Sequence, residues 1–130
     1  MKKDFQKWHD KKEKIHTGRP YVFFQEREVW FCSLGANVGY EQDGSGDEFL
    51  RPVVIVKKFN TEICFAVPLT KGKKKEKPYY FTFSFRPRVQ STGILSQMRL
   101  IDAKRLRYKV GTISEKAFGV LKAKIRRLLA

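Results

Sequence analysis

A carboxylate and an arginine stand close enough in the sequence to act together on a phosphate group. Glu41 lies in the segment Gly39–Gln42, and Arg51 begins an apolar run after eight intervening residues. A guanidinium can bind two phosphate oxygens at once, and a nearby carboxylate can serve as a general base. The simpler alternative is that Glu41 only forms a salt bridge with Arg51.

A threonine and a group of lysines follow the third apolar run of the chain. Thr70 comes directly before five lysines, namely Lys71, Lys73, Lys74, Lys75 and Lys77. We expect the hydroxyl of Thr70 to face the same basic rim as these ammonium groups. The alternative for Thr70 is an ordinary turn residue at the end of a strand.

Positive charge dominates the chain and is concentrated in its second half. The 130 residues include 28 Lys and Arg against 13 Asp and Glu, a net charge of +15. Residues 71–130 hold 17 basic and three acidic side chains, whereas residues 23–70 hold four basic and seven acidic ones. Such one-sided charge favours a polyanion, above all nucleic acid, as the partner. A merely solubilising surface is the alternative, and a membrane surface is less favoured because no long amphipathic helix carries the charges.

Metal, nucleotide and disulfide chemistry are not indicated. His9 and His16 have no further ligand at a usual spacing, and the chain has no phosphate-binding G-x-x-x-x-G-K-[ST] motif. Cys32 and Cys64 lie inside apolar runs and are expected to be buried free thiols. No apolar run approaches the ~20 residues of a membrane span, and no secretory signal is present. We expect no metal, no cofactor, no membrane segment and a place in the reducing cytoplasm.

An amphipathic helix is predicted at the start of the chain, over residues 4–16. Phe5, Trp8 and Ile15 share one face of this helix. The segment Thr17–Pro20 ends it, because proline lacks an N–H and restricts the residue before it. Residues 1–22 are therefore predicted to be a helical extension that docks through Phe5 and Trp8 on a main domain of residues 23–130.

Short strands and a closing helix are predicted for the main domain. Strand-forming runs between turn residues cover residues 28–34, 51–56, 62–69, 78–85, 92–101 and 108–112. The run 51–56 is expected to be buried on both faces, and Pro68 indicates a strand edge or end. Residues 35–47 carry four glycines and are expected to form a mobile loop. Ser114, or a box of Thr112 and Glu115, caps the last helix, so we predict a mainly β fold, a small, partly open β-barrel.

Six short segments keep an order and spacing that recur together in one protein family. They are Glu28–Phe31 with Ser33–Leu34, Gly39–Gln42, Arg51–Val56, Val67–Thr70, Leu95–Asp102 with Lys104–Leu106, and Val110–Ser114. In this pattern the chain resembles the MazF/PemK (Kid-like) toxins of bacterial type II toxin–antitoxin systems. The resemblance runs from about residue 27 to residue 129 and leaves out only the N-terminal helix.

The resemblance implies a small SH3-like barrel that forms a homodimer and cleaves single-stranded RNA, often mRNA, without a metal or another cofactor. The RNA would lie in a basic groove at the dimer interface, under the loop between the first two strands. Glu41, Arg51 and Thr70 fall on positions of the cleavage site, as candidate base, cation and hydrogen-bond donor. The residues expected to bind RNA are Tyr40, Gln42, Gln97 and the lysines Lys71, Lys73, Lys74, Lys75 and Lys77. An acidic antitoxin would compete for the same basic surface.

Three departures from the family pattern bear on activity. Tyr40 stands where relatives often carry serine or histidine, and Ser96 stands where they often carry an acidic residue. The segment Asp43–Leu50 is longer than the compact family form and adds negative charge, including Asp47 and Glu48, which should weaken RNA binding unless the loop swings away. These departures leave two alternatives on the same barrel: a non-catalytic nucleic-acid-binding module, and a toxin that acts by binding another protein.

Overall fold

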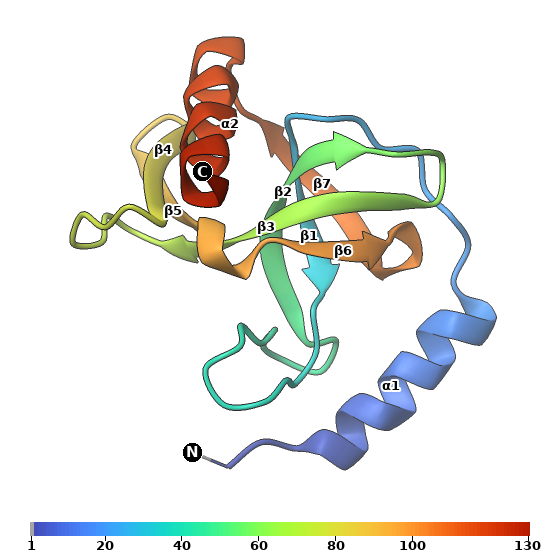
Figure 1. Ribbon diagram of the computed structural model, residues 1–130. Coiled ribbons are helices and arrows are strands. Elements are labelled where there is room, and N and C mark those ends of the chain that lie inside the picture. The colour runs from blue at the N-terminus through green and yellow to red at the C-terminus, as the bar shows by residue number, and fades with distance from the viewer. Residues whose placement is uncertain (1) are drawn as a thin grey trace.

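Strands dominate the described part of the chain, with one α-helix before them and one after. The computed structural model describes residues 2–130 (Figure 1). Its elements are α1 (Phe5–Gly18), β1 (Glu28–Ser33), β2 (Leu50–Lys58), β3 (Ile63–Lys71), β4 (Tyr80–Arg86), β5 (Val89–Ile94), the 3-10 turn η1 (Leu95–Gln97), β6 (Arg99–Asp102), the 3-10 turn η2 (Ala103–Arg105), β7 (Leu106–Thr112) and α2 (Glu115–Leu129). The predicted mainly β fold with a helix near each end is confirmed.

The strands form a curved antiparallel sheet that does not close into a full barrel. Their order is β4-β5-β3-β2-β1-β7, and β6 also pairs with β3. The end strands β4 and β7 share no backbone ladder within residues 2–130 and meet through side chains. Arg86 donates from Nε and Nη2 to the Val110 carbonyl at 3.1 and 2.9 Å, and Phe85 covers Gly111. The predicted partly open barrel is therefore confirmed.

One edge of β3 changes its partner at Pro68. β6 pairs with Ile63–Ala66, and β5 pairs with Leu69–Lys71. Pro68 lies between the two ladders, where its missing N–H removes no hydrogen bond from this edge. The proline thus marks a break in one edge, as predicted, but the strand itself continues to Lys71.

The predicted strand over residues 92–101 is wrong, because the structure divides it in two. β5 ends at Ile94, η1 follows, and β6 begins at Arg99. Leu95 is buried at the start of η1, so packing in the core draws the chain out of one ladder before it joins the next. Composition does not reveal this one-turn interruption, since all its residue types are common in strands or turns. The turn places Gln97 at a corner between the two strands.

Two apolar clusters pack against the sheet, one on each face, because neighbouring residues of a strand point to opposite faces. Trp30 and Ile55 belong to the first cluster, whereas Val54 belongs to the second. The predicted burial of β2 on both faces is thereby confirmed. Cys32 and Cys64 are buried and free, as predicted, and burial raises the pKa of each thiol to about 12.

Helix α2 covers the second cluster with an apolar stripe. Phe118 and Leu121 are its buried residues. Ser114 caps the helix, since its hydroxyl accepts a hydrogen bond from the Ala117 N–H at 3.1 Å. Ser114 is therefore the N-cap of α2, and among the described residues the alternative box of Thr112 and Glu115 is not formed.

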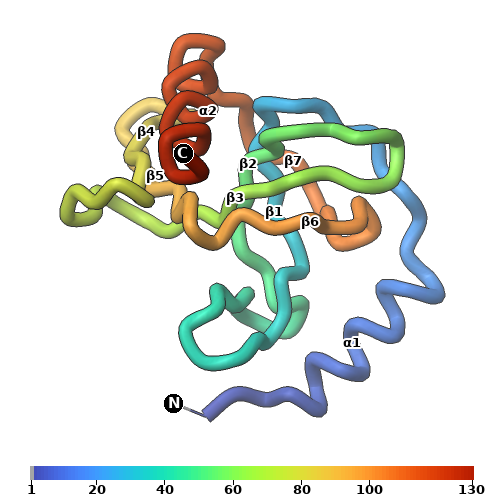
Figure 2. Tube along the Cα trace, viewed as in Figure 1, coloured from blue at the N-terminus to red at the C-terminus, as the bar shows by residue number. Residues whose placement is uncertain are grey.

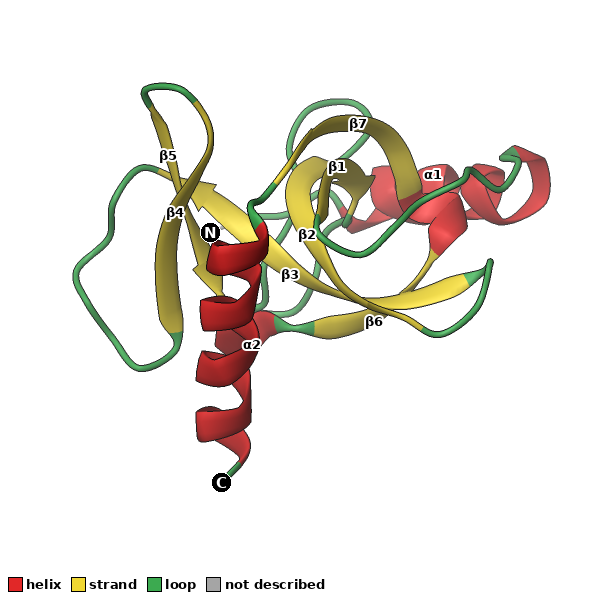
Figure 3. Ribbon diagram, turned by 90° about the horizontal axis from the view of Figure 1, so that it is seen from above, coloured by secondary structure: helices red, strands yellow, loops and turns green. Residues whose placement is uncertain are grey.

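Helix α1 lies beside the loop that joins β1 to β2, on the opposite side of the molecule from α2 (Figure 1, Figure 3). The chain trace leads from α1 along an extended segment into β1 (Figure 2). Trp8 and Ile15 are buried against Ala36 and Phe49, whereas Phe5 is 51% exposed. Docking through Trp8 is confirmed, and docking through Phe5 is wrong. No helix within residues 2–130 has the length and hydropathy to cross a membrane.

Candidate active site

The β1–β2 loop (residues 34–49) is folded back on itself and anchored at its base. The Leu34 N–H donates to the Phe49 carbonyl at 2.9 Å, and the Gly44 N–H donates to the Gly35 carbonyl at 2.8 Å. Gly35 has a φ of +94°, and a Cβ there would lie 2.1 Å from the Trp8 ring, so glycine is required. The loop expected to be mobile is thus held by its own backbone and by α1.

Arg51 is positioned by two backbone carbonyls from different parts of the chain. Its Nε donates to the Asp43 carbonyl of the loop, and its Nη1 donates to the Leu69 carbonyl of β3 at 3.2 Å. Burial lowers the pKa of Arg51, and the charge of Asp43 opposes that shift. Because an arginine has five N–H donors, the guanidinium keeps donors for an anion beyond these two contacts.

Thr70 lies next to Arg51 on the neighbouring strand. The β2–β3 ladder starts at the pair Val53 and Pro68, two residues after Arg51 on β2 and two residues before Thr70 on β3. Thr70 is half-buried and directly follows Leu69, whose carbonyl holds the Arg51 side chain. The structure therefore brings this predicted pair together.

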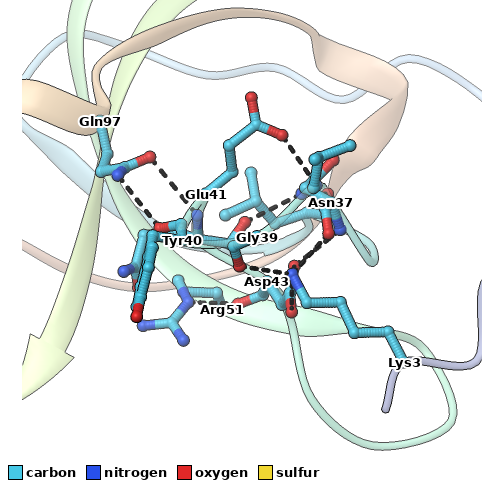
Figure 4. A network of polar contacts seen from close by, with 11 residues as sticks. Lys3, Asn37, Gly39, Tyr40, Glu41, Asp43, Arg51 and Gln97 are labelled. Atoms are coloured by element: carbon cyan, nitrogen blue, oxygen red, sulfur yellow. Dashed lines mark hydrogen bonds and ion pairs between the residues drawn. The ribbon is translucent and has the colours of Figure 1, made fainter. Parts of the chain in front are cut away.

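Glu41 does not pair with Arg51. Its Oε1 accepts a hydrogen bond from the Val38 N–H at 2.8 Å, and its own N–H donates to the Val38 carbonyl at 3.0 Å. Figure 4 shows the Glu41 carboxylate and the Arg51 guanidinium on opposite sides of the loop backbone. The alternative of a salt bridge between them is wrong. The carboxylate would reach a phosphate on Arg51 only after leaving the Val38 N–H.

A cleft of about 380 Å³ separates the β1–β2 loop from η1. Gln97 links its two sides, since its Oε1 accepts from the Gln42 N–H and its Nε2 donates to the Tyr40 carbonyl, both at 3.4 Å (Figure 4). Glu41, Gln42 and Gln97 line the cleft. The Tyr40 side chain is 95% exposed beside it. Three predicted site residues thus line one cleft, and Tyr40 is joined to it through its backbone carbonyl.

Two further residues belong to this region and were not predicted as site residues. Arg99 lines the cleft beside Ser96 and supplies a cation there, whereas Arg51 and Thr70 are not among its lining residues. Its only sequence signal is its place two residues after Gln97 in a family-like segment. Asp43 holds Arg51 through a main-chain carbonyl, and no residue type encodes a contact of that kind.

The five lysines of residues 71–77 lie apart from the cleft. All five are exposed, and within residues 2–130 no hydrogen bond or ion pair joins them to a cleft residue. Their loop starts beside Thr70 and projects away from the β1–β2 loop (Figure 1). Lys73 and Lys74 line a separate cavity of about 260 Å³ with Tyr80 and Lys124. The expected basic rim therefore begins next to Thr70 but extends away from Glu41.

The acidic residues of the β1–β2 loop face the N-terminal region. Asp43 pairs with Lys3 at 2.9 Å, and Asp47 pairs with Lys7 at 2.7 Å. The hydrogen bond and charge of Lys7 hold the pKa of Asp47 below its ordinary value. Neighbouring ammonium groups therefore compensate the charges of Asp43 and Asp47, and the expected effect of these carboxylates on RNA binding stays a prediction.

Glu48 is compensated in the same way by a group of cations. Its Oε1 lies 3.0 Å from Arg107 Nε and 3.5 Å from both Lys11 and Arg19. Burial acts to raise the pKa of Glu48, but the hydrogen bond and charge of Arg107, with those of Lys11, hold it below its ordinary value. The third acidic side chain is thus also paired within the molecule.

Metal-ligating side chains do not gather in threes or more anywhere in residues 2–130. His9 and His16 are both exposed on α1. The prediction that these histidines are solvated is confirmed.

Known proteins match the chain in sequence pattern and in fold. A family model described as "PemK-like, MazF-like toxin of type II toxin-antitoxin system" matches residues 25–129. No curated protein matches the chain. MazF from Deinococcus radiodurans has a TM-score of 0.62 and 16% identity, over 83% of this chain and 97% of that chain. An endoribonuclease from a mycobacterial species, solved in complex with its cognate antitoxin, has a TM-score of 0.60 and 14% identity, over 82% and 94% of the two chains.

The family match spans the whole sheet and both sides of the cleft. It begins just before β1, ends in α2 and leaves out α1. Every predicted site residue, from Tyr40 to Gln97, lies inside it. The chain therefore belongs to the PemK-like, MazF-like toxin family of type II toxin–antitoxin systems.

Proposed function

We propose that the protein is an endoribonuclease toxin that cleaves single-stranded RNA, including mRNA, without a metal ion. The observation that carries this proposal is the Arg51 side chain, held between the β1–β2 loop and β3 by the carbonyls of Asp43 and Leu69. A half-buried guanidinium with free donors suits a phosphate group. The family match and the fold shared with MazF and with the mycobacterial endoribonuclease support the proposal.

The proposed reaction is an internal transfer at one phosphodiester of the RNA. The ribose 2′-hydroxyl loses its proton to a base, and its oxygen forms a bond to phosphorus. The bond from phosphorus to the 5′-oxygen breaks, and that oxygen takes a proton from an acid. The products are a 2′,3′-cyclic phosphate and a 5′-hydroxyl. Negative charge develops on the phosphate oxygens, where fixed donors lower the barrier.

Arg51 and Thr70 are the proposed donors to those oxygens. The guanidinium is fixed before substrate arrives, so little reorganisation is needed when charge develops. Thr70 lies near it on β3, and its hydroxyl can donate to a second, non-bridging oxygen. Arg99 on the far side of the cleft adds a cation for a neighbouring phosphate.

Glu41 is the proposed base, and it must first release the Val38 N–H. Binding of RNA in the cleft would supply competing contacts for the loop and free the carboxylate. The acid is Tyr40, Arg51 or a water molecule. Tyr40→Phe separates these choices, since it abolishes turnover only if the phenol delivers the proton. Equal turnover in that variant assigns the proton to Arg51 or water.

RNA binding is proposed to use the remaining predicted residues. Exposed Tyr40 can stack on a base, whereas Gln42 and Gln97 offer amide groups within the cleft. The lysines Lys71, Lys73, Lys74, Lys75 and Lys77 attract the phosphate backbone. We propose a homodimer in the cytoplasm and an acidic antitoxin that binds the same basic surface.

The decisive experiment incubates the purified protein with single-stranded RNA in the presence of EDTA. We expect discrete cuts with cyclic phosphate ends. Arg51→Ala should abolish them, while Arg126→Ala removes the same charge from an exposed position on α2 and should leave cutting intact. Thermal denaturation of both variants confirms that they are folded.

Other outcomes contradict the proposal in distinct ways. Uncut RNA that binds tightly in a salt-sensitive manner would favour a non-catalytic nucleic-acid-binding module. Cutting that requires a divalent ion would contradict metal independence alone. Neither cutting nor binding of RNA would favour a toxin that acts by binding another protein.

A further inference from the structure

The N-terminal arm (residues 2–18) contacts the β1–β2 loop through the side chain of Lys3. The Lys3 ammonium donates to the carbonyls of Asn37 and Gly39, the latter at 3.0 Å, and lies 2.9 Å from the Asp43 carboxylate (Figure 4). Only 8% of its side chain is exposed. Three oxygen-bearing groups of one loop thus match the three donors of an ammonium group.

Asp43 connects this ammonium group with the proposed catalytic arginine. Its carboxylate also accepts from the Asn37 N–H at 2.7 Å, while its carbonyl accepts from Arg51 Nε. Asn37 donates from Nδ2 to the Gln42 carbonyl at 2.9 Å. The contacts of Lys3 therefore fix the loop at the residue that holds Arg51 and next to the residue that lines the cleft.

Packing at the base of the loop holds the arm in place. Trp8 is 6% exposed and lies with its ring 5.3 Å from that of Phe49. Gly35 has no side chain at the point where the indole ring approaches. Burial of an aromatic ring supplies the larger part of such a contact, so Trp8 anchors the arm and Lys3 sets the shape of the loop.

Basic residues on and directly after α1 face acidic residues of the β1–β2 loop. Lys7 pairs with Asp47, and Lys11 and Arg19 lie near Glu48. The acidic residues belong to the segment that departs from the compact family pattern, and the arm lies outside residues 25–129 of the family match. The arm, which lies outside the family match, therefore pairs with acidic residues that lie inside it.

We propose that the N-terminal arm holds Asp43 of the β1–β2 loop where its carbonyl orients the guanidinium, with Lys3 as a positioning residue for Arg51. The inference rests on the proposed function. Lys3 acts through Asp43, since its three partners all belong to the loop. Loss of its ammonium group loosens the carbonyl that orients the guanidinium and slows the chemical step, while the RNA-binding surface stays the same.

The test compares Lys3→Met with Lys14→Met in the full chain. Lys14 is exposed on α1 and forms no hydrogen bond or ion pair within residues 2–130. The Lys14→Met variant therefore loses the same charge as Lys3→Met without losing a contact to the loop. In steady-state cleavage of single-stranded RNA, Lys3→Met should lower kcat roughly 10- to 100-fold, the cost expected for a misplaced catalytic group. KM should stay within about twofold, and Lys14→Met should match the unchanged protein. Equal melting temperatures show that the fold is intact.

Hydrogen exchange provides a second readout that does not depend on activity. The Asn37 amide, bonded to the Asp43 carboxylate, should exchange faster in Lys3→Met than in Lys14→Met. An unchanged kcat overturns the inference, and a higher kcat shows instead that the arm inhibits the enzyme. If the unchanged protein does not cut RNA, the proposed function fails; equal exchange rates would then also overturn the role of Lys3 in the loop, and faster exchange would support it.

Discussion

The two long loops beside the candidate site are held in opposite ways. The β1–β2 loop is crossed by its own backbone bonds, by Trp8 and by the Lys3 ammonium group. The loop between β3 and β4 (residues 72–79) has a backbone bond near each end, from Gly72 to Gln90 and from Tyr80 to Lys77, and its lysines are exposed. Asp43, Asp47 and Glu48 of the first loop are paired with cations, whereas the lysines of the second loop are exposed.

Under the proposed function, the two loops have two tasks with different geometric demands. Groups that stabilise a reacting phosphate must stay within a fraction of an ångström of their positions. Groups that attract an RNA backbone act through a field that reaches over about 10 Å at ordinary salt concentration. The first loop therefore suits catalysis and the second suits capture of the substrate.

Breaking the held loop at its base should have the largest effect. Gly35→Ala meets both a positive φ and the Trp8 ring, so we expect destabilisation on the order of 3 kcal/mol. Gly39→Ala also has a positive φ, but open space surrounds it, so it should cost about 1 kcal/mol. Urea denaturation of both variants measures the difference. Equal losses would mean that Trp8 does not press on the loop.

Thr70 lies near the start of the second loop and directly follows Leu69, whose carbonyl holds Arg51. The effect of replacing Thr70 on turnover and on RNA affinity shows to which of the two loops it belongs functionally. Thr70→Val keeps the shape of the side chain and removes its hydroxyl. If Thr70 serves the transition state, kcat falls roughly 10- to 100-fold and RNA affinity barely changes. A parallel loss of affinity would place Thr70 with the lysines as a binding residue. Single-turnover kinetics and equilibrium binding separate the two results.

Neutralising the open loop should weaken binding and leave turnover intact. The triple change Lys73→Gln, Lys74→Gln and Lys75→Gln should reduce the slope of log affinity against log salt by about 2, since each contact with single-stranded RNA contributes about 0.7. Affinity should fall roughly tenfold at low salt. The same three-charge change at exposed Lys2, Lys14 and Lys116 serves as the control. A fall in kcat at saturating RNA would contradict the division of tasks.

Acid should loosen the held loop by a small amount. The ion pair with Lys7 lowers the pKa of Asp47 in the folded state, so the unfolded state binds its proton at a higher pH. The stabilisation is therefore complete above the unfolded pKa of about 3.9 and is lost as pH falls through the lower folded value. Between pH 5 and 3, the melting temperature of Asp47→Asn should fall less steeply than that of the unchanged protein, by about 2 °C or less. Identical slopes would show that this pair does not stabilise the loop.

Local patterns predicted most of the fold. The spacing of Trp8 and Ile15 predicted the buried face of α1, and the apolar run of β2 predicted burial on both faces. The turn η1 escaped prediction because burial of Leu95 interrupts a strand-like sequence, and burial depends on the assembled core. Phe5 lies on the predicted helix face but stays half exposed, beside an open cavity that Ala36 and Val38 of the loop also line.

The sequence indicated those candidate site residues whose charge or hydroxyl group is itself the functional feature. Arg51 and Thr70 stand out by charge, hydroxyl and position at the ends of adjacent strands. The contact between Lys3 and Asp43 joins residues 40 positions apart and depends on how the intervening loop folds, so no spacing rule reveals it. The hydrogen bond from the Val38 N–H to the Glu41 carboxylate was not predicted either. The sequence alone does not tell whether a carboxylate three residues after an N–H closes a turn or acts on a substrate.

The end of the arm and the residue that follows it, Arg19, are hydrogen-bonded to the turn η2. Arg19 Nη1 donates to the carbonyls of Lys104 and Arg105 at 3.2 and 3.3 Å, and Lys104 Nζ donates to the His16 carbonyl at 3.0 Å. These partners lie 85 to 88 residues apart in the chain. During synthesis, which runs from the N-terminus, the arm is made first but completes its contacts only when η2 has left the ribosome. A nascent chain that ends before η2 therefore lacks the bonds that join His16 and Arg19 to this turn.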